Sequence, residues 1–141
     1  MGAYISLNQV LALAEKATNS SFRQIPRKKI MFRTTTAEGK SVTLCSPQSK
    51  LHSQGFFWVD ITQEQYRVLS ETDSGLVIFR LEGMKLAMVK WLELKAFLTA
   101  KCMQYNANEQ NHWKLNLFSD HIKVVKNKEE MPIEIVSCIP E

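Results

Sequence analysis

The spacing of apolar residues predicts an amphipathic helix near the start of the chain. Four of them recur at intervals of three and four positions and so share one face: Leu7, Val10, Leu11 and Ala14. Ser6 and Gln9 have the spacing of a capping box, in which the serine hydroxyl bonds the Gln9 amide and the Gln9 side chain bonds back. The pattern therefore predicts a helix over residues 7–18.

Two further helices are predicted later in the chain. Thr62 and Gln65 repeat the capping-box spacing, which predicts a short helix over residues 62–71. A third helix is predicted over residues 91–103, where one side is apolar and consists of Trp91, Leu94, Leu98 and Cys102.

Between the helices, apolar and polar positions alternate with a period of two, which is typical of β-strands. The strands predicted in this way cover residues 30–34, 41–50, 55–61, 76–81, 84–90, 113–118, 122–125 and 133–136. Glu82 and Gly83 predict a two-residue hairpin loop, because glycine supplies the positive φ that such a loop needs. The polar residues 104–111 are predicted to form a loop.

These elements together predict an α+β fold. Connections this short favour a single, mostly antiparallel or mixed β-sheet of about six to eight short strands, with three α-helices packed on it. The length of 141 residues, with 45% apolar and 23% charged residues, fits one globular domain over residues 1–141. Residues 137–141 are predicted to be a loose tail.

Two observations favour a cytoplasmic protein that does not enter a membrane. No apolar run reaches the roughly 18 residues that span a bilayer, and no signal-peptide pattern is visible. The three cysteines, Cys45, Cys102 and Cys138, are odd in number and form no C-x-x-C pair. This usage is typical of free thiols in a reducing compartment.

The net charge of +4 is concentrated in one segment. Residues 22–51 carry seven basic side chains against Glu38 alone, a net charge of +6, whereas residues 52–141 carry a net charge of −2. Clustered cations attract a polyanion and release its condensed counterions. The cations expected to contact DNA or RNA are Arg23, Arg27, Lys28, Lys29, Arg33, Lys40 and Lys50. The alternative is a solvated edge strand whose lysines discourage aggregation.

An aromatic run follows this segment at Phe56, Phe57 and Trp58. Aromatic rings beside cations can stack on bases, as in proteins that bind single strands. Trp58 therefore joins the candidate nucleic-acid-binding residues, with Phe56 as the alternative ring. A core strand with one exposed ring would give the same run of residues.

The triplet Gln48-Ser49-Lys50 ends a predicted strand, and the order of elements around it resembles the core of the PD-(D/E)xK nucleases. The resemblance implies a metal held by an Asp on one strand and by a carboxylate at the position of Gln48, with Lys50 as the family's lysine. Between Ile30 and Ser49 the only acid is Glu38, so the hard anionic ligands of a divalent cation are missing. The resemblance favours an inactive, nuclease-like binding core over an active nuclease.

No other motif predicts an enzyme, a cofactor or a metal site. His52, His112 and His121 are too scattered for a helical ligand pair, and no phosphate-binding loop or nucleophile elbow occurs. Catalytic groups that converge from distant segments would leave no such motif. The first hypothesis is therefore a nucleic-acid-binding protein. The second is a non-enzymatic interaction module that self-associates through a sheet edge or an exposed aromatic patch. The third is the degenerate nuclease core.

Overall fold

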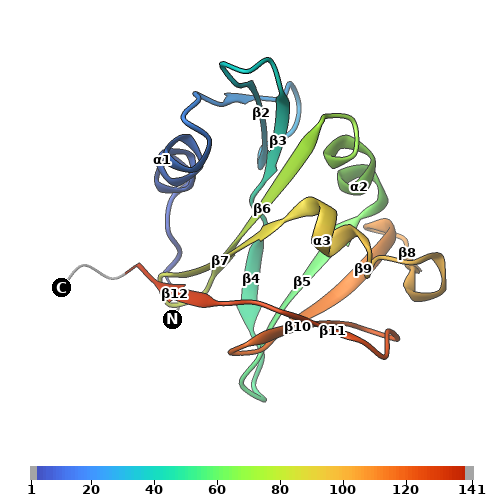
Figure 1. Cartoon of the computed structure of the whole chain (residues 1–141). Coiled ribbons are helices and arrows are strands. Elements are labelled where there is room, and N and C mark those ends of the chain that lie inside the picture. Colours follow the sequence, from blue (N-terminus) through green and yellow to red (C-terminus); the bar gives the residue numbers. More distant parts are fainter. Residues whose placement is uncertain (1–2, 139–141) are drawn as a thin grey trace.

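The computed structural model describes residues 3–138 (Figure 1). Its helices are α1 (Leu7–Thr18), α2 (Gln63–Leu69) and α3 (Trp91–Lys95), with a 3-10 turn, η1 (Ala100–Cys102). Its strands are β1 (Arg23–Gln24), β2 (Met31–Thr35), β3 (Ser41–Cys45), β4 (Gln48–Leu51), β5 (Phe57–Thr62), β6 (Ser74–Leu81), β7 (Lys85–Lys90), β8 (Gln104–Asn106), β9 (Gln110–Leu117), β10 (His121–Val124), β11 (Glu130–Pro132) and β12 (Ile135–Ser137).

The twelve strands form one large mixed sheet, and this sheet dominates the structure. The prediction of an α+β fold with six to eight strands is therefore wrong. Strands of two or three residues, such as β1, β8 and β11, are too short to show a period of two. The predicted strand over residues 41–50 is divided at Ser46 and Pro47 into β3 and β4.

β3 and β4 lie one after the other along the same edge of β6. Both run parallel to β6, with β3 beside residues 74–77 and β4 beside Arg80 and Leu81. Their other edges differ, because β3 pairs with β2 whereas β4 pairs with β5, both antiparallel. The corner between β3 and β4 is therefore the place where the sheet passes from β2 to β5.

The backbone of this corner is held by Arg80, which is 7% exposed. The Arg80 side chain donates from Nε and Nη2 to the Ser46 carbonyl at 3.2 and 2.9 Å, and the Arg80 backbone N–H donates to the Pro47 carbonyl at 2.9 Å. The Ser46 hydroxyl donates to the Ile78 carbonyl at 2.8 Å. Arg80 forms no ion pair with the described residues, and burial lowers its pKa. The guanidinium thus donates to the Ser46 carbonyl, which the break between β3 and β4 leaves without a partner strand.

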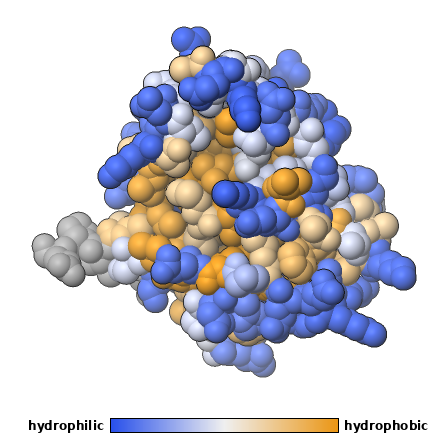
Figure 2. Space-filling model, viewed as in Figure 1, coloured by the Kyte–Doolittle hydropathy of each residue, from blue (hydrophilic) through white to orange (hydrophobic). Residues whose placement is uncertain are grey.

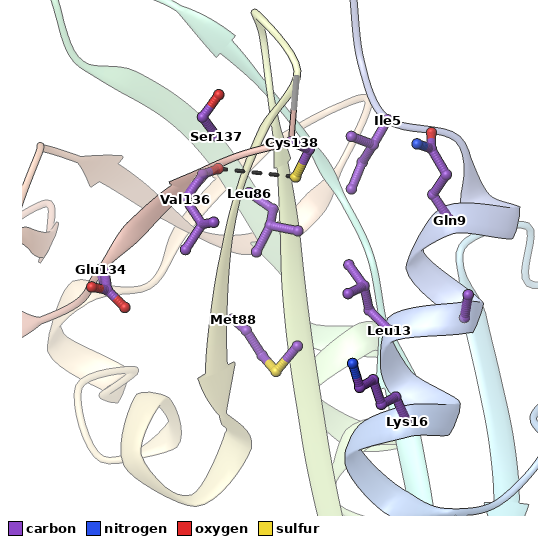
Figure 3. Close-up of a pocket in the computed structure, with 11 residues that line it drawn as sticks. Ile5, Gln9, Leu13, Lys16, Leu86, Met88, Glu134, Val136, Ser137 and Cys138 are labelled. Carbon is purple, nitrogen blue, oxygen red and sulfur yellow. Dashed lines mark hydrogen bonds between the residues drawn. The ribbon is translucent and has the colours of Figure 1, made fainter. Parts of the chain in front are cut away.

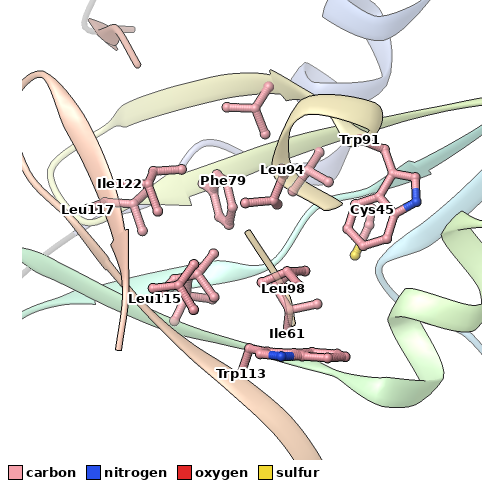
Figure 4. Close-up of a cluster of buried hydrophobic side chains, with 14 of the residues drawn as sticks. Cys45, Ile61, Phe79, Trp91, Leu94, Leu98, Trp113, Leu115, Leu117 and Ile122 are labelled. Carbon is pink, nitrogen blue, oxygen red and sulfur yellow. The ribbon is translucent and has the colours of Figure 1, made fainter. Parts of the chain in front are cut away.

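The last part of the described chain closes the sheet around a core. β11 pairs with β10, the Ile133 N–H donates to the Asp120 carbonyl at 3.0 Å, and β12 then pairs with β7. Residues 130–137 (red in Figure 1) therefore bridge β10 and β7. The larger hydrophobic core lies inside, and the side chains labelled in Figure 4 reach it from the strands, from α3 and from Leu98; Val68 and Leu69 of α2 also belong to it.

A smaller hydrophobic cluster lies on the opposite side of the sheet, under α1. Val10 and Ala14 of this helix are buried there against residues of β2, β3, β6 and β7. The members contributed by these strands are Phe32, Val42, Leu44, Ile78 and Leu86. We call the side of the sheet that faces away from the larger core the outer side, and α1 covers one part of it.

The first two predicted helices are confirmed, with both capping boxes formed at Ser6 and Thr62. The third is wrong beyond Lys95, where α3 ends. Past this point, side chains bond the carbonyls that a longer helix would use. The Phe97 carbonyl accepts from Asn127 Nδ2 at 3.0 Å, and the Thr99 carbonyl accepts from Trp113 Nε1 at 2.7 Å.

The β6–β7 hairpin is confirmed, but its loop has three residues and not two. Leu81 pairs with Lys85, which leaves Glu82, Gly83 and Met84 in the loop. Gly83 and Met84 both have positive φ, 93° and 60°. Their N–H groups donate to the carbonyl of Ala3 at 2.8 and 2.9 Å. This acceptor, from a distant part of the sequence, holds the longer loop in place.

Two segments that were predicted to be irregular contain strands. The predicted loop over residues 104–111 holds β8 and the start of β9, which pair antiparallel. Ser137, predicted to lie in the tail, pairs with Lys85, and the Cys138 N–H donates to the Met84 carbonyl at 2.8 Å. Residues 139–141 of the predicted tail lie outside the described residues.

Gly75→Ala is expected to destabilise the protein by about 1–3 kcal/mol, because a methyl group would overpack the core. A Cβ at Gly75 would lie 2.6 Å from the Cβ of Trp91. The Trp91 indole cannot move aside freely, since it is 3% exposed and donates to Ser70 Oγ at 3.1 Å. Urea denaturation measures the loss. Ser74→Ala in the same strand is the control and should change stability by less than about 0.5 kcal/mol. Equal losses in both variants would contradict overpacking at Gly75.

Candidate nucleic-acid interface

The structure places most of the predicted basic residues near β1, β2 and α2. Arg23 of β1 lies directly opposite Arg33 of β2. Arg27, Lys28 and Lys29 occupy the turn between these two strands, where Arg27 takes a left-handed conformation with φ 66°. Lys40 lies in the turn between β2 and β3.

Acids of α2 and of the turn after it neutralise two of these cations. Lys28 Nζ lies 2.9 Å from Glu64 Oε2, and Arg33 Nη2 lies 3.1 Å from Glu71 Oε1. Arg67 stands between the two acids and pairs with both. The hydrogen bonds from Arg67 and Lys28 lower the pKa of Glu64 to about 2. The five side chains thus form a chain of alternating charge on the surface.

Four other cations of the segment lie on β1 and in the turns on either side of β2. Arg23, Arg27, Lys29 and Lys40 are exposed and form no ion pair with the described residues. The hydrogen bonds from Ser41 are the main cause of the lowered pKa of Asp73, and the positive charge of Lys40 adds to it. Lys50 lies away from this group, since β4 is separated from β2 by β6 and β3 in the sheet.

Lys50 and Trp58 are direct neighbours across two strands. Lys50 of β4 lies opposite Trp58 of β5, Trp58 opposite Asn116 of β9, and Asn116 opposite Lys123 of β10. Directly opposite residues of antiparallel strands point to the same side, so these four side chains form one row on the outer side, and Glu130 of β11, opposite Lys123, continues it. Trp58 is 40% exposed, whereas Trp91 and Trp113 are each 3% exposed.

A row of aromatic rings lies beside it. The ring centroids of His52 and Phe56 are 4.6 Å apart, those of Phe56 and Phe118 are 5.3 Å apart, and those of Phe118 and His121 are 4.6 Å apart. Phe56 and Phe118 each stand two positions from a member of the first row, so alternation puts them on the same side. All four rings are half-buried.

We call the outer side of β4, β5, β9 and β10 the outer face. The buried side chains of α2 and α3 belong to the larger core on the opposite side, and those of α1 pack on β2, β3, β6 and β7. Within the part of the chain that the structure describes, this face is therefore not covered by a helix, and both rows can be reached by a ligand.

A third row adds an acid and a lysine. Asp60 of β5 lies opposite Lys114 of β9, with 3.7 Å between Lys114 Nζ and Asp60 Oδ1. The Asp60 side chain is 8% exposed, and its Oδ1 has no hydrogen-bond partner among residues 3–138. The pKa of the Glu109 carboxyl is raised, chiefly because its protonated form can hydrogen-bond the neighbouring Asp60 and also because Glu109 is partly buried. A proton on Glu109 would give Asp60 Oδ1 the donor that it lacks.

The nuclease-like triplet gains no metal ligands from the fold. Gln48 and Lys50 are both exposed on β4, and Gln48 lies opposite Arg80. The nearby Glu82 carboxylate accepts a hydrogen bond from the Leu51 N–H at 2.9 Å. Across residues 3–138, no three His, Cys, Asp or Glu side chains are placed to hold a metal ion together.

The sequence did not identify most members of the outer face. His52 and Phe56 lie far from Phe118 and His121 in the chain, and only strand register brings these two pairs of rings together. Asn116 and Lys123 become neighbours of Trp58 for the same reason. The one local signal was alternation, which places residues 56, 58 and 60 on one side of a strand.

No known protein family matches the chain, and no curated protein or solved structure is significantly similar to it. Among the described residues, no helix has both the length and the apolar character needed to cross a membrane.

Glu109→Gln is expected to stabilise the protein at pH 7 by less than about 1 kcal/mol, because Glu109 is partly exposed. The amide can donate to Asp60 where the ionised carboxylate cannot. The raised pKa means that the folded state binds this proton more tightly than the unfolded state. Stability is then greatest below the pKa of the unfolded carboxyl and falls as pH rises through the folded pKa. The gain should therefore disappear near pH 4.

Urea denaturation of both proteins at pH 4 and pH 7 measures the difference. Glu129→Gln, at an exposed position in the turn before β11, is the matched control and should show no gain at either pH. A loss of stability in Glu109→Gln at pH 7 would contradict the shared proton.

Proposed function

We propose that the protein binds single-stranded nucleic acid, DNA or RNA, across the outer face of β4, β5, β9 and β10. The observation that carries the proposal is the register that puts Lys50 directly opposite the exposed Trp58, with Asn116 and Lys123 next along the row. The net charge of +4 favours a polyanionic ligand.

Each member of the row has a role that suits this ligand. The Trp58 ring offers a plate on which a base stacks, a contact worth about 1–3 kcal/mol. Lys50 and Lys123 lie on either side of Trp58, on strands that are about 14 Å apart at three strand spacings. Lys50 can therefore contact a phosphate on one side of a stacked base, and Lys123 can do so on the other side if its Nζ exchanges the hydrogen bond that it donates to the Asn127 carbonyl at 3.1 Å for one to the phosphate. Asn116 supplies an amide that can bond the edge of a base.

A single strand suits this surface better than a duplex does. Stacking on Trp58 requires the free face of a base, and in a duplex these faces are covered by neighbouring base pairs. Single-strand binders combine aromatic rings with cations that follow the backbone, as the outer face does.

The basic segment 22–51 has a different role in this proposal from the one that the sequence suggested. Lys28 and Arg33 are paired with acids, so they are less available to phosphates. Arg23, Arg27, Lys29 and Lys40, which form no ion pair within residues 3–138, contribute a positive field that attracts the ligand over a distance. The direct contacts are assigned to Lys50 and Trp58.

A cytoplasmic location remains part of the proposal. Cys45, Cys102 and Cys138 are all free thiols. Burial raises the pKa of the Cys45 thiol to about 12, which makes it unreactive. Free thiols of this kind suit a reducing compartment.

Trp58→Ala is expected to weaken binding of a labelled 20-nucleotide oligo(dT) or oligo(U) by about 5-fold to 150-fold, the equivalent of one lost stacking contact. Binding is measured by fluorescence anisotropy at low salt. In the unaltered protein, the same ligand should quench tryptophan emission, since Trp58 is the tryptophan that solvent reaches. A 20-base-pair duplex should bind more weakly than either single strand.

Lys50→Glu and Lys40→Glu form a matched pair with the same charge change at two places. Lys50→Glu should weaken binding and flatten the salt dependence by about one unit of slope, as expected for a lost phosphate contact. Lys40→Glu should have a much smaller effect. Greater losses in Lys40→Glu than in Lys50→Glu would move the site from the outer face to the exposed cations around β1 and β2. Absence of binding to every oligonucleotide at low salt would refute the function.

A further inference from the structure

An apolar groove runs along one side of α1, between this helix and the strands β7 and β12 (Figure 3). It has a volume of about 740 Å³, and its main lining residues are Leu13, Lys16, Leu86, Met88, Glu134 and Val136. We call it the α1–β7 groove. Figure 2 shows apolar surface gathered in this region, with hydrophilic residues around it.

The groove continues past Met88 into a second hollow of about 570 Å³, which reaches Lys90 and Leu92. Four large apolar side chains along this path are exposed: Leu13 at 36%, Met88 at 39%, Val136 at 45% and Leu92 at 82%. Single exposed apolar residues are ordinary, but a continuous group in a groove marks an interaction site.

The shape of the groove suits a helix. α1 packs on Leu86 of β7, but Met88 of β7 and Val136 of β12 stay exposed beside the helix, so among residues 3–138 no second helix covers this part of the outer side. A second helix beside α1 would lie at the usual separation of about 8–10 Å. The 12 residues of α1 extend for about 18 Å, so the partner helix needs about three turns.

The charges around the groove indicate what kind of helix fits. Lys16 and Lys90 are exposed and form no ion pair with the described residues. Glu134 stands at the β12 end, and the carboxylate of Asp73 already accepts two hydrogen bonds from Ser41. A second copy of the chain, docked through its own α1–β7 groove, would bring its lysines close to these two. An acidic partner would instead pair with the lysines that are present.

We propose that the α1–β7 groove binds a short, acidic amphipathic helix of another protein. The apolar stripe of that helix packs on Leu13 and Met88, and its acidic side chains face Lys16 and Lys90. Helices recognised in this way present apolar residues at positions i, i+3, i+4 and i+7. The inference does not depend on nucleic-acid binding, because the groove and the outer face use different side chains.

The test uses two labelled peptides of 16 residues, capped at both ends. One has leucine at helical spacing and glutamate elsewhere, and the other has lysine in place of each glutamate. Anisotropy titration with the whole protein should show that the glutamate peptide binds at least about tenfold more tightly than the lysine peptide. Leu13→Glu or Met88→Glu should weaken binding by about tenfold or more, since each is a central apolar contact.

Control variants test whether the peptide occupies the α1–β7 groove. Tyr105→Glu places the same charge at a residue of β8 that is 66% exposed, and it should leave peptide binding unchanged. Trp58→Ala should also leave it unchanged, whatever its effect on oligonucleotides. The double variant Lys16→Glu with Lys90→Glu should reverse the preference to the lysine peptide. Equal binding of both peptides, or of neither, would refute the proposal. So would self-association in sedimentation that Leu13→Glu abolishes, because it would assign the groove to a second copy.

Discussion

The corner at Ser46 and Pro47 is the constraint on which the rest of the sheet depends. The chain passes here from β3 to β4, and both strands pair with the same edge of β6. On the other side, however, β3 pairs with β2 whereas β4 pairs with β5. Arg80 makes the corner possible, since its two side-chain donors bond the Ser46 carbonyl inside the protein. A buried polar group without such a partner would destabilise the fold. The placement of Lys50 beside Trp58 follows directly from this corner.

The sequence predicted the features that depend on near neighbours. Both capping boxes join residues three positions apart, so Ser6 with Gln9 and Thr62 with Gln65 were visible in the pattern. Features that depend on distant residues were missed. The corner needs Arg80, which lies 34 positions beyond Ser46. The early end of α3 needs the side chains of Trp113 and Asn127, which donate hydrogen bonds to backbone carbonyls just after the helix. No period in the local sequence carries this information.

The same distinction explains how the candidate site was predicted. Lys50 and Trp58 were identified from residue type alone, but their row requires the pairing of four strands. The basic segment was overestimated, because the acids that pair with Lys28 and Arg33 come from α2 and the turn after it, 36 and 38 positions later. Counting charge along a segment cannot show that Glu64 and Glu71 fold back onto it.

The outer face and the α1–β7 groove are both on the side of the sheet away from the larger core, and β6 separates their strands.

The bridge formed by residues 130–137 has a consequence for how the protein folds during its synthesis. These residues join β10 to β7 through pairs such as Ile135 with Ala87, contacts between positions that are far apart in the chain. Contacts of this kind slow folding, because a long loop must close before they form. During synthesis, β7 leaves the ribosome well before its partner strand β12. The backbone groups along that edge of β7 therefore stay unpaired until β12 has been made. We expect the nascent chain to need protection from aggregation until the bridging segment has left the ribosome.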